Sequence, residues 1–175
     1  MILTDREIRL EIEAGNIRFE PDIDRELQIG DASVDVRLGR HLRIPETDEN
    51  IIIRPRARNR PELYGALREL DSTGYNLPSH KLVLASTYEK LTLPNYLVGR
   101  LEGKSSLARF GLSVHVTSGH IDPGFSGVIV LELCNMGPNI IVIEPLMPIA
   151  HILFEKVSLP PSKSYAGQFA QQLHP

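Results

Sequence analysis

A single carboxylate lies in the middle of the most apolar stretch of the sequence, GVIVLELCN, which spans residues 127–135. If this stretch is a strand, its side chains alternate between two faces, and Glu132 shares one face with two valines and the cysteine. An ionised carboxylate is costly to bury unless it is paired or hydrogen-bonded. Glu132 is therefore either one half of a structural ion pair or a functional carboxylate.

A run of hydroxyl and cationic side chains, GKSSLARFG, spans residues 103–111. Its spacing does not match a phosphate-binding P-loop, because only three residues separate Gly99 from Gly103 and the P-loop requires four. The hydroxyls of Ser105 and Ser106, the cations Lys104 and Arg109, and backbone N–H groups at a helix start could still bind an anion. The alternative is a surface turn with a helix cap.

The turn-rich segment TSGHIDPGFSG, residues 117–127, contains Asp122 and Phe125. An Asp before Pro-Gly commonly caps a turn, and Phe125 could be a core residue. The six histidines lack metal-ligand spacing, and one cysteine cannot build the Cys/His cluster of zinc deaminases. The sequence therefore predicts no zinc site.

Length and composition predict an ordinary globular protein. The chain has 175 residues, is 42% hydrophobic and 23% charged, and carries a net charge of -3. This balance does not indicate a nucleic-acid-binding protein, and no apolar run approaches the ~20 residues of a membrane span. The single cysteine and the lack of a signal-peptide pattern predict a cytoplasmic protein.

The elements that must position these residues are mostly short strands. The capping-box pattern TDRE at residues 4–7 predicts a short N-terminal helix that ends at Gly15. Beyond it, short β-branched runs alternate with Gly, Pro and Asn, and one further short helix could lie within residues 61–74. We expect an all-β domain over residues 1–160, a sandwich, jelly roll or barrel, and a mobile tail over residues 161–175.

The order of GKSSLARFGL, VHVTSGHIDPGFSG and VIVLEL resembles the dCTP deaminase family, which belongs to the trimeric dUTPase-like superfamily. The resemblance extends to TDREI and ASVDVRLG near the start and to a shortened SKSYAGQ near the end. It implies a distorted jelly roll or β-sandwich of the dUTPase-like type. It also implies a homotrimer whose sites are shared between neighbouring chains.

By this resemblance, Glu132 is the acid and base of a metal-free deamination of dCTP to dUTP and ammonia. Ser105 and Arg109 would support catalysis. Asp122 would read the deoxyribose 3′-hydroxyl, and backbone groups of Val130 and Leu131 the pyrimidine edge. The triphosphate would carry Mg²⁺. The nucleotide-binding candidates are Lys104, Ser105, Ser106, Leu107, Ala108, Arg109, Asp122, Val130, Leu131, Glu132, His151, Lys163, Tyr165 and Gln168.

Several positions depart from the family pattern. Lys104 stands where many members have Arg, and His151 stands where relatives often have Gln. The tail is compressed, but Tyr165 and Gln168 keep the family spacing, which predicts a lid that orders over bound nucleotide.

Two alternatives to dCTP deamination alone stay open. Gly119 in the Ser-Gly pair resembles bifunctional members, in which Asp122 would help orient water at the α-phosphate and dUMP and diphosphate would form. The other alternative is a catalytically silent nucleotide-binding regulatory protein. The family also makes dTTP a candidate feedback inhibitor.

Overall fold

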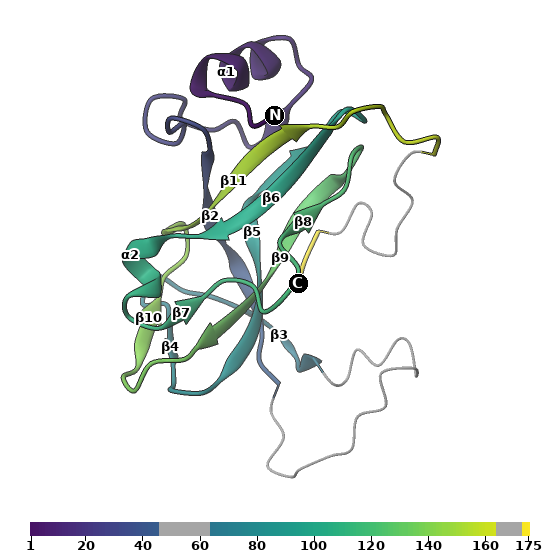
Figure 1. Cartoon of the computed structure of the whole chain (residues 1–175). Helices are drawn as coiled ribbons and strands as arrows, with labels where there is room; N and C mark the ends of the chain where they lie inside the picture. The colour runs from purple at the N-terminus through teal and green to yellow at the C-terminus, as the bar shows by residue number, and fades with distance from the viewer. Residues whose placement is uncertain (46–63, 164–172) are drawn as a thin grey trace.

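The computed structural model describes residues 1–45, 64–163 and 173–175, which form a curled antiparallel sheet with a helix at its N-terminal end (Figure 1). The predicted all-β class with a short N-terminal helix is confirmed. The elements are α1 (Asp5–Glu13), β1 (Arg18–Glu20), β2 (Val34–Arg43), β3 (Leu67–Glu69), β4 (Tyr75–Leu77), β5 (Leu82–Thr92), β6 (Leu97–Gly103), α2 (Ser105–Ala108), β7 (Leu112–Ser113), β8 (His120–Ile121), β9 (Ser126–Asn135), β10 (Ile141–Ile143) and β11 (Pro148–Lys156).

The capping box predicted at the start of α1 is present. The backbone N–H of Thr4 donates to the Glu7 carboxylate at 3.2 Å, and Gly15 follows the helix with a φ of 72°. A positive φ costs glycine little, so this residue ends the helix where the sequence predicted. Ile8 is buried, and Glu7 pairs with Lys156 of β11 at 3.0 Å. These contacts fix α1 against the sheet.

Within the described residues, the main sheet has the order β7-β9-β5-β2-β11-β6-β8, with β1 beside β5 and β3 beside β2. The register shifts between Leu38 and Leu42 of β2 within its pairing with β5, and between Ser86 and Lys90 of β5 within its pairing with β9. Such irregularities bend a strand and increase its twist. The bent β5 lets the sheet curl around one core, in which Leu131 and Phe154 are fully buried.

The short helix expected within residues 61–74 is wrong for the part that the structure describes. Leu67–Glu69 forms β3, which pairs antiparallel with β2 through Arg43 and Leu67. Pairing with a neighbouring strand overrides the weak local helix preference. Residues 61–63 lie outside the described residues.

The described residues at the start and at the end of the C-terminal segment, 160–163 and 173–175, differ in their surroundings. Residues 160–163 are exposed, whereas Pro175 is buried and its carbonyl accepts a hydrogen bond from Arg43 Nε at 2.5 Å. The rings of His41 and His174 meet edge to face at 4.9 Å. Neither helix in the described residues has the length and apolar character that crossing a membrane requires.

Candidate active site

Glu132 lies on the partly exposed face of β9, together with Val128, Val130 and Cys134. The opposite face of the strand packs into the core. The alternation was predicted, and Glu132 is half-buried in the single chain because its face of the sheet is only partly covered. In the described residues Glu132 forms no ion pair, which argues against the structural alternative.

The Glu132 carboxylate is held by the loop that follows β7. Its Oε2 accepts a hydrogen bond from the backbone N–H of Val116 at 2.9 Å, and its own N–H donates to the carbonyl of Val114 at 3.1 Å. The far end of the loop is tied to β6, because the N–H of Leu101 donates to the carbonyl of Gly119 at 2.8 Å. The loop is therefore clamped between β6 and β9.

The edge of β9 beside Glu132 has backbone groups that face no strand. Backbone groups of alternate residues point to the same side of a strand, so those of Val130 point the same way as the N–H of Glu132. On that side β7 ends at Ser113, and the described residues supply no further strand there. Leu131 instead faces Ala85 of β5 in the ladder. The N–H and C=O of Val130 thus face no described strand.

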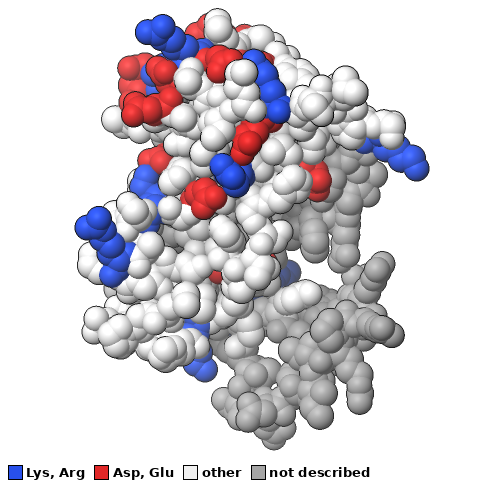
Figure 2. Space-filling model, viewed as in Figure 1, with Lys and Arg blue, Asp and Glu red and all other residues white. Residues whose placement is uncertain are grey.

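The predicted anion-binding run forms the end of β6 and the short helix α2. Ser105, Ser106 and Arg109 are exposed, and Leu107 packs against the core. Ala108 is exposed as well. Figure 2 shows basic side chains on the α2 side of the molecule, whereas basic and acidic side chains mix around α1. These hydroxyls and the Arg109 guanidinium are accessible to solvent.

Asp35 of β2 contacts this run, although sequence reasoning did not single it out. The Lys104 ammonium lies 2.5 Å from its carboxylate. His151 of β11 stands opposite Asp35 on one side and Glu102 of β6 on the other. The structure therefore brings Lys104 and His151 together, and adds two carboxylates to them. The signal was the exposed-face position of Asp35 in the alternating run ASVDVRLG.

Asp122 lies in the turn between β8 and β9. Its Oδ1 is 3.2 Å from His120 Nε2, and its carbonyl accepts a hydrogen bond from the N–H of Phe125 at 3.1 Å. Phe125 is buried, as its alternative assignment to the core predicted. His120 was not singled out in the sequence.

The two groups of candidate residues are separate within one chain. Leu112, just after the α2 segment, pairs with Asn135, and Glu132 lies three residues, ~10 Å, further along β9. No hydrogen bond or ion pair in the described ranges joins Ser105 or Arg109 to Glu132. The candidate residues thus fall into two groups: the candidates for anion binding around α2, here called the anion-binding half, and Glu132 with its loop, here called the carboxylate half.

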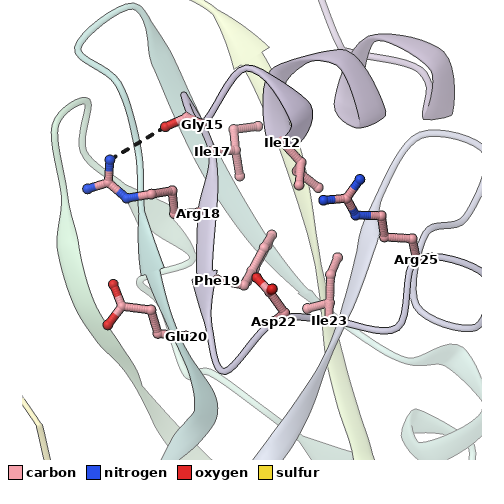
Figure 3. A pocket seen from close by; sticks show the side chains of 9 residues that line it. All are labelled: Ile12, Gly15, Ile17, Arg18, Phe19, Glu20, Asp22, Ile23 and Arg25. Atoms are coloured by element: carbon pink, nitrogen blue, oxygen red, sulfur yellow. Dashed lines mark hydrogen bonds between the residues drawn. The ribbon is translucent and has the colours of Figure 1, made fainter.

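A hollow of about 370 Å³ lies between these halves, lined by residues of α2, β7 and the loop after it, including Ala108, Ser113 and His115. A hollow of about 270 Å³ between α1 and β1 is shown in Figure 3. Arg18 and Arg25 line the second hollow together with Glu20 and Asp22, so its charges are balanced and it contains none of the predicted site residues. The first hollow touches Ala108 and the loop that holds Glu132, but Glu132 itself does not line it.

The remaining predicted site residues are partly outside the described structure. Lys163 is exposed, and Tyr165 and Gln168 lie outside the described residues. In the described part of the chain, no group of three or more His, Cys, Asp or Glu side chains could hold a metal ion.

Comparison with known proteins gives one consistent family. The model of the dCTP deaminase-like family matches residues 2–157. A Corynebacterium glutamicum protein named "dCTP deaminase, dUMP-forming" is 45% identical over 167 residues, which cover 95% of this chain and 87% of that protein. A Beutenbergia cavernae protein of the same name is 41% identical over 167 residues, which cover 95% and 85%.

Among solved structures, 2′-deoxycytidine 5′-triphosphate deaminase from Agrobacterium tumefaciens superposes with a TM-score of 0.67 at 24% identity. The match covers 89% of this chain and 48% of the other, so this chain spans about half the length of that one. At this identity the likeness shows the fold, and it confirms the predicted architecture.

Proposed function

Because the chain belongs to the dCTP deaminase-like family, we propose that it hydrolyses dCTP first to dUTP and ammonia and then to dUMP and diphosphate. The sequence alone favoured dUTP as the product, with dUMP as the alternative. The alternative takes precedence because the relatives at 45% and 41% identity are named dUMP-forming.

The observation that carries the first step is the place of Glu132 two residues from Val130, whose backbone groups on that edge of β9 face no described strand. Its Oε2 is occupied by the N–H of Val116, and its Oε1 has no partner in the described residues. The neighbouring N–H and C=O of Val130 can pair with the edge of a pyrimidine ring. A cytosine bound there would lie beside a carboxylate with one free oxygen.

In the deamination step, Glu132 takes a proton from water as the water oxygen bonds to C4 of cytosine. The carboxyl group passes that proton to N3. The carboxylate then takes the remaining proton of the new C4 hydroxyl and delivers it to the amino group, so that the carbonyl of uracil forms, the bond between C4 and the amino nitrogen breaks, and ammonia leaves. Such acid–base catalysis typically contributes ~10²–10⁴-fold in rate. Ser105 and Arg109 would support this step.

In the second step, water attacks the α-phosphorus of dUTP and diphosphate leaves. Asp122 is the candidate that orients this water, and Lys104, Ser105 and Ser106 are candidates to bind the phosphates. Mg²⁺ would be carried by the triphosphate, where it neutralises part of the negative charge. Hydroxyl and ammonium groups suit phosphate oxygens, which is consistent with a metal brought by the nucleotide.

A homotrimer would complete each site from two chains. The anion-binding half and the carboxylate half are not joined within one chain, and large apolar side chains near them are exposed. Phe110 is 68% exposed, Met136 70% and Val116 56%. Exposed apolar groups of this kind are typical of surfaces that contact another protein.

The test is to incubate the protein with dCTP and Mg²⁺ and to measure dUTP, dUMP, ammonia and diphosphate over time. We expect ammonia and diphosphate in equal amounts, with dUMP as the final nucleotide. Accumulation of dUTP without diphosphate would show that the protein only deaminates dCTP, as the sequence alone favoured. Binding of dCTP without any product would instead identify the silent regulatory protein.

A further inference from the structure

Glu89 of β5 is a deeply buried carboxylate that the proposed chemistry does not use. It is 1% exposed. Its Oε2 accepts the backbone N–H of Arg37 at 2.9 Å, and its Oε1 accepts Arg37 Nε at 2.6 Å and Gln28 Nε2 at 3.2 Å. A buried carboxylate that has all these donors is held in one orientation.

This cluster fills the place where β5 separates from β2. Gln28 also donates from Nε2 to the carbonyl of Asp35 at 2.9 Å, and the N–H of Asp35 donates to the carbonyl of Gln28 at 2.7 Å. The backbone of β2 from Asp35 to Arg37 is therefore fixed by Gln28 and Glu89 where no neighbouring strand pairs with it on that side.

The Arg37 side chain is held at one edge and left open at the other. Its Nε is bound to Glu89, and its guanidinium carbon lies 5.0 Å from the centre of the Tyr88 ring. The side chain is 30% exposed, and its two terminal amino groups have no partner in the described residues. The free edge of a fixed guanidinium suits bidentate binding of a phosphate.

Arg37 lies next to the proposed phosphate site. Asp35 and Arg37 are two residues apart on the same face of β2, which corresponds to ~7 Å. Asp35 binds the ammonium of Lys104 at 2.5 Å, and Lys104 leads directly into α2. Asp35 occupies the ammonium of Lys104, whereas the terminal amino groups of Arg37 are open, so Arg37 adds hydrogen-bond donors for a polyphosphate on this face of β2.

We propose that Arg37 is a further phosphate-binding residue, and that Glu89 is the positioning residue that aims its terminal amino groups at the substrate. This inference rests on the proposed function, since the anion is the triphosphate of the nucleotide. If Arg37 were only a structural partner of Glu89, its two terminal amino groups would not need to stay open. The arrangement gives the phosphates a fixed second cation beside Lys104.

The test compares Arg37→Met with Arg9→Met in the full chain. Arg9 is a matched control because it pairs with Glu26 at 3.0 Å and is 34% exposed, but lies on α1. Binding is measured by calorimetry with dCTP, with inorganic tripolyphosphate and with deoxycytidine, all in Mg²⁺. For Arg37→Met we expect Kd to rise about ten- to hundredfold for dCTP and tripolyphosphate and to stay unchanged for deoxycytidine. Arg9→Met should match the wild type with all three ligands.

Two more variants separate positioning from folding. Glu89→Gln keeps the volume of the side chain but loses the charge that orients Arg37. It should therefore weaken the binding of tripolyphosphate and leave the binding of deoxycytidine unchanged. Arg37→Lys should not restore binding, because an ammonium lacks the guanidinium fork. If Arg37→Met does not fold, Arg37→Met/Glu89→Gln, which removes the uncompensated charge, takes its place and is expected to show the same loss of tripolyphosphate binding.

The outcomes distinguish this inference from the proposed function. If the wild type turns over dCTP and the Arg37 variants bind tripolyphosphate as Arg9→Met does, Arg37 is only a structural partner and the inference is wrong. If the wild type binds neither dCTP nor tripolyphosphate, the proposed function fails as well.

Discussion

The carboxylate of Glu132 accepts a hydrogen bond from the backbone N–H of Val116 at 2.9 Å, across the gap between β9 and the loop after β7. The proposed acid–base group is therefore also the group that holds the loop. One oxygen accepts this hydrogen bond, and the other has no partner in the described residues. The two roles can be separated by substitution.

Replacing Glu132 by Gln should abolish deamination and preserve the loop. The amide oxygen can still accept the N–H of Val116, but an amide cannot take a proton from water. We expect the deamination rate to fall by ~10²–10⁴-fold, with dCTP still bound. Ammonia release and calorimetric binding check this result. More than a tenth of the wild-type rate would refute the assignment of Glu132.

Gly119→Ala should disturb the same loop from its other end. A Cβ at Gly119 would lie 2.6 Å from the carbonyl oxygen of Leu101, so the backbone must move. A shift of the loop that holds Glu132 should lower kcat for deamination by roughly ten- to hundredfold. Gly30→Ala is the control, because its Cβ would meet Ser33 Oγ at an ordinary 3.5 Å. Equal rates in the two variants would show that the loop tolerates the change.

The sequence predicted those parts of the fold and site that depend on local pattern. The TDRE capping box predicted α1, and strand alternation predicted which residues share a face with Glu132. Alternation does not tell which face is covered, so the exposure of Glu132 was not predicted. The contact between Lys104 and Asp35 depends on β11 lying between β2 and β6, and no local pattern contains that non-local pairing.

Stability should fall at high pH through Tyr96. Burial, together with its 2.7 Å hydrogen bond to Glu11, raises the pKa of Tyr96 from 10.0 to about 12. Between these values the unfolded chain loses the proton while the folded chain keeps it, so the free energy of unfolding decreases as pH rises. Tyr96→Phe should lose less stability across this range. Denaturant unfolding at successive pH values measures the difference, and parallel curves would contradict it.

Deamination should not depend on zinc. The sequence offers one cysteine and no paired histidines at ligand spacing, and the proposed base is Glu132. Prolonged treatment with a zinc-selective chelator should leave ammonia release unchanged while Mg²⁺ is in excess. Metal analysis of the same sample is the control. Stoichiometric zinc whose removal stops the reaction would overturn the proposed mechanism.

Mixing two inactive variants should restore activity if the site is shared between chains. In one chain, Glu132 and Arg109 lie in separate halves, so each site in the proposed homotrimer would take Glu132 from one chain and Arg109 from its neighbour. Glu132→Gln and Arg109→Met should each be inactive alone. After unfolding and refolding together in equal amounts, a site is intact when a chain with Glu132 adjoins a chain with Arg109. Random assembly makes this true for about one quarter of the sites in a cyclic trimer. We therefore expect about one quarter of the wild-type rate per site, measured as ammonia release.

The variants refolded separately and then combined are the control, since intact oligomers that do not exchange subunits stay inactive. If co-refolding restores nothing although an affinity tag on one variant retains the other variant as well, both residues serve sites within single chains.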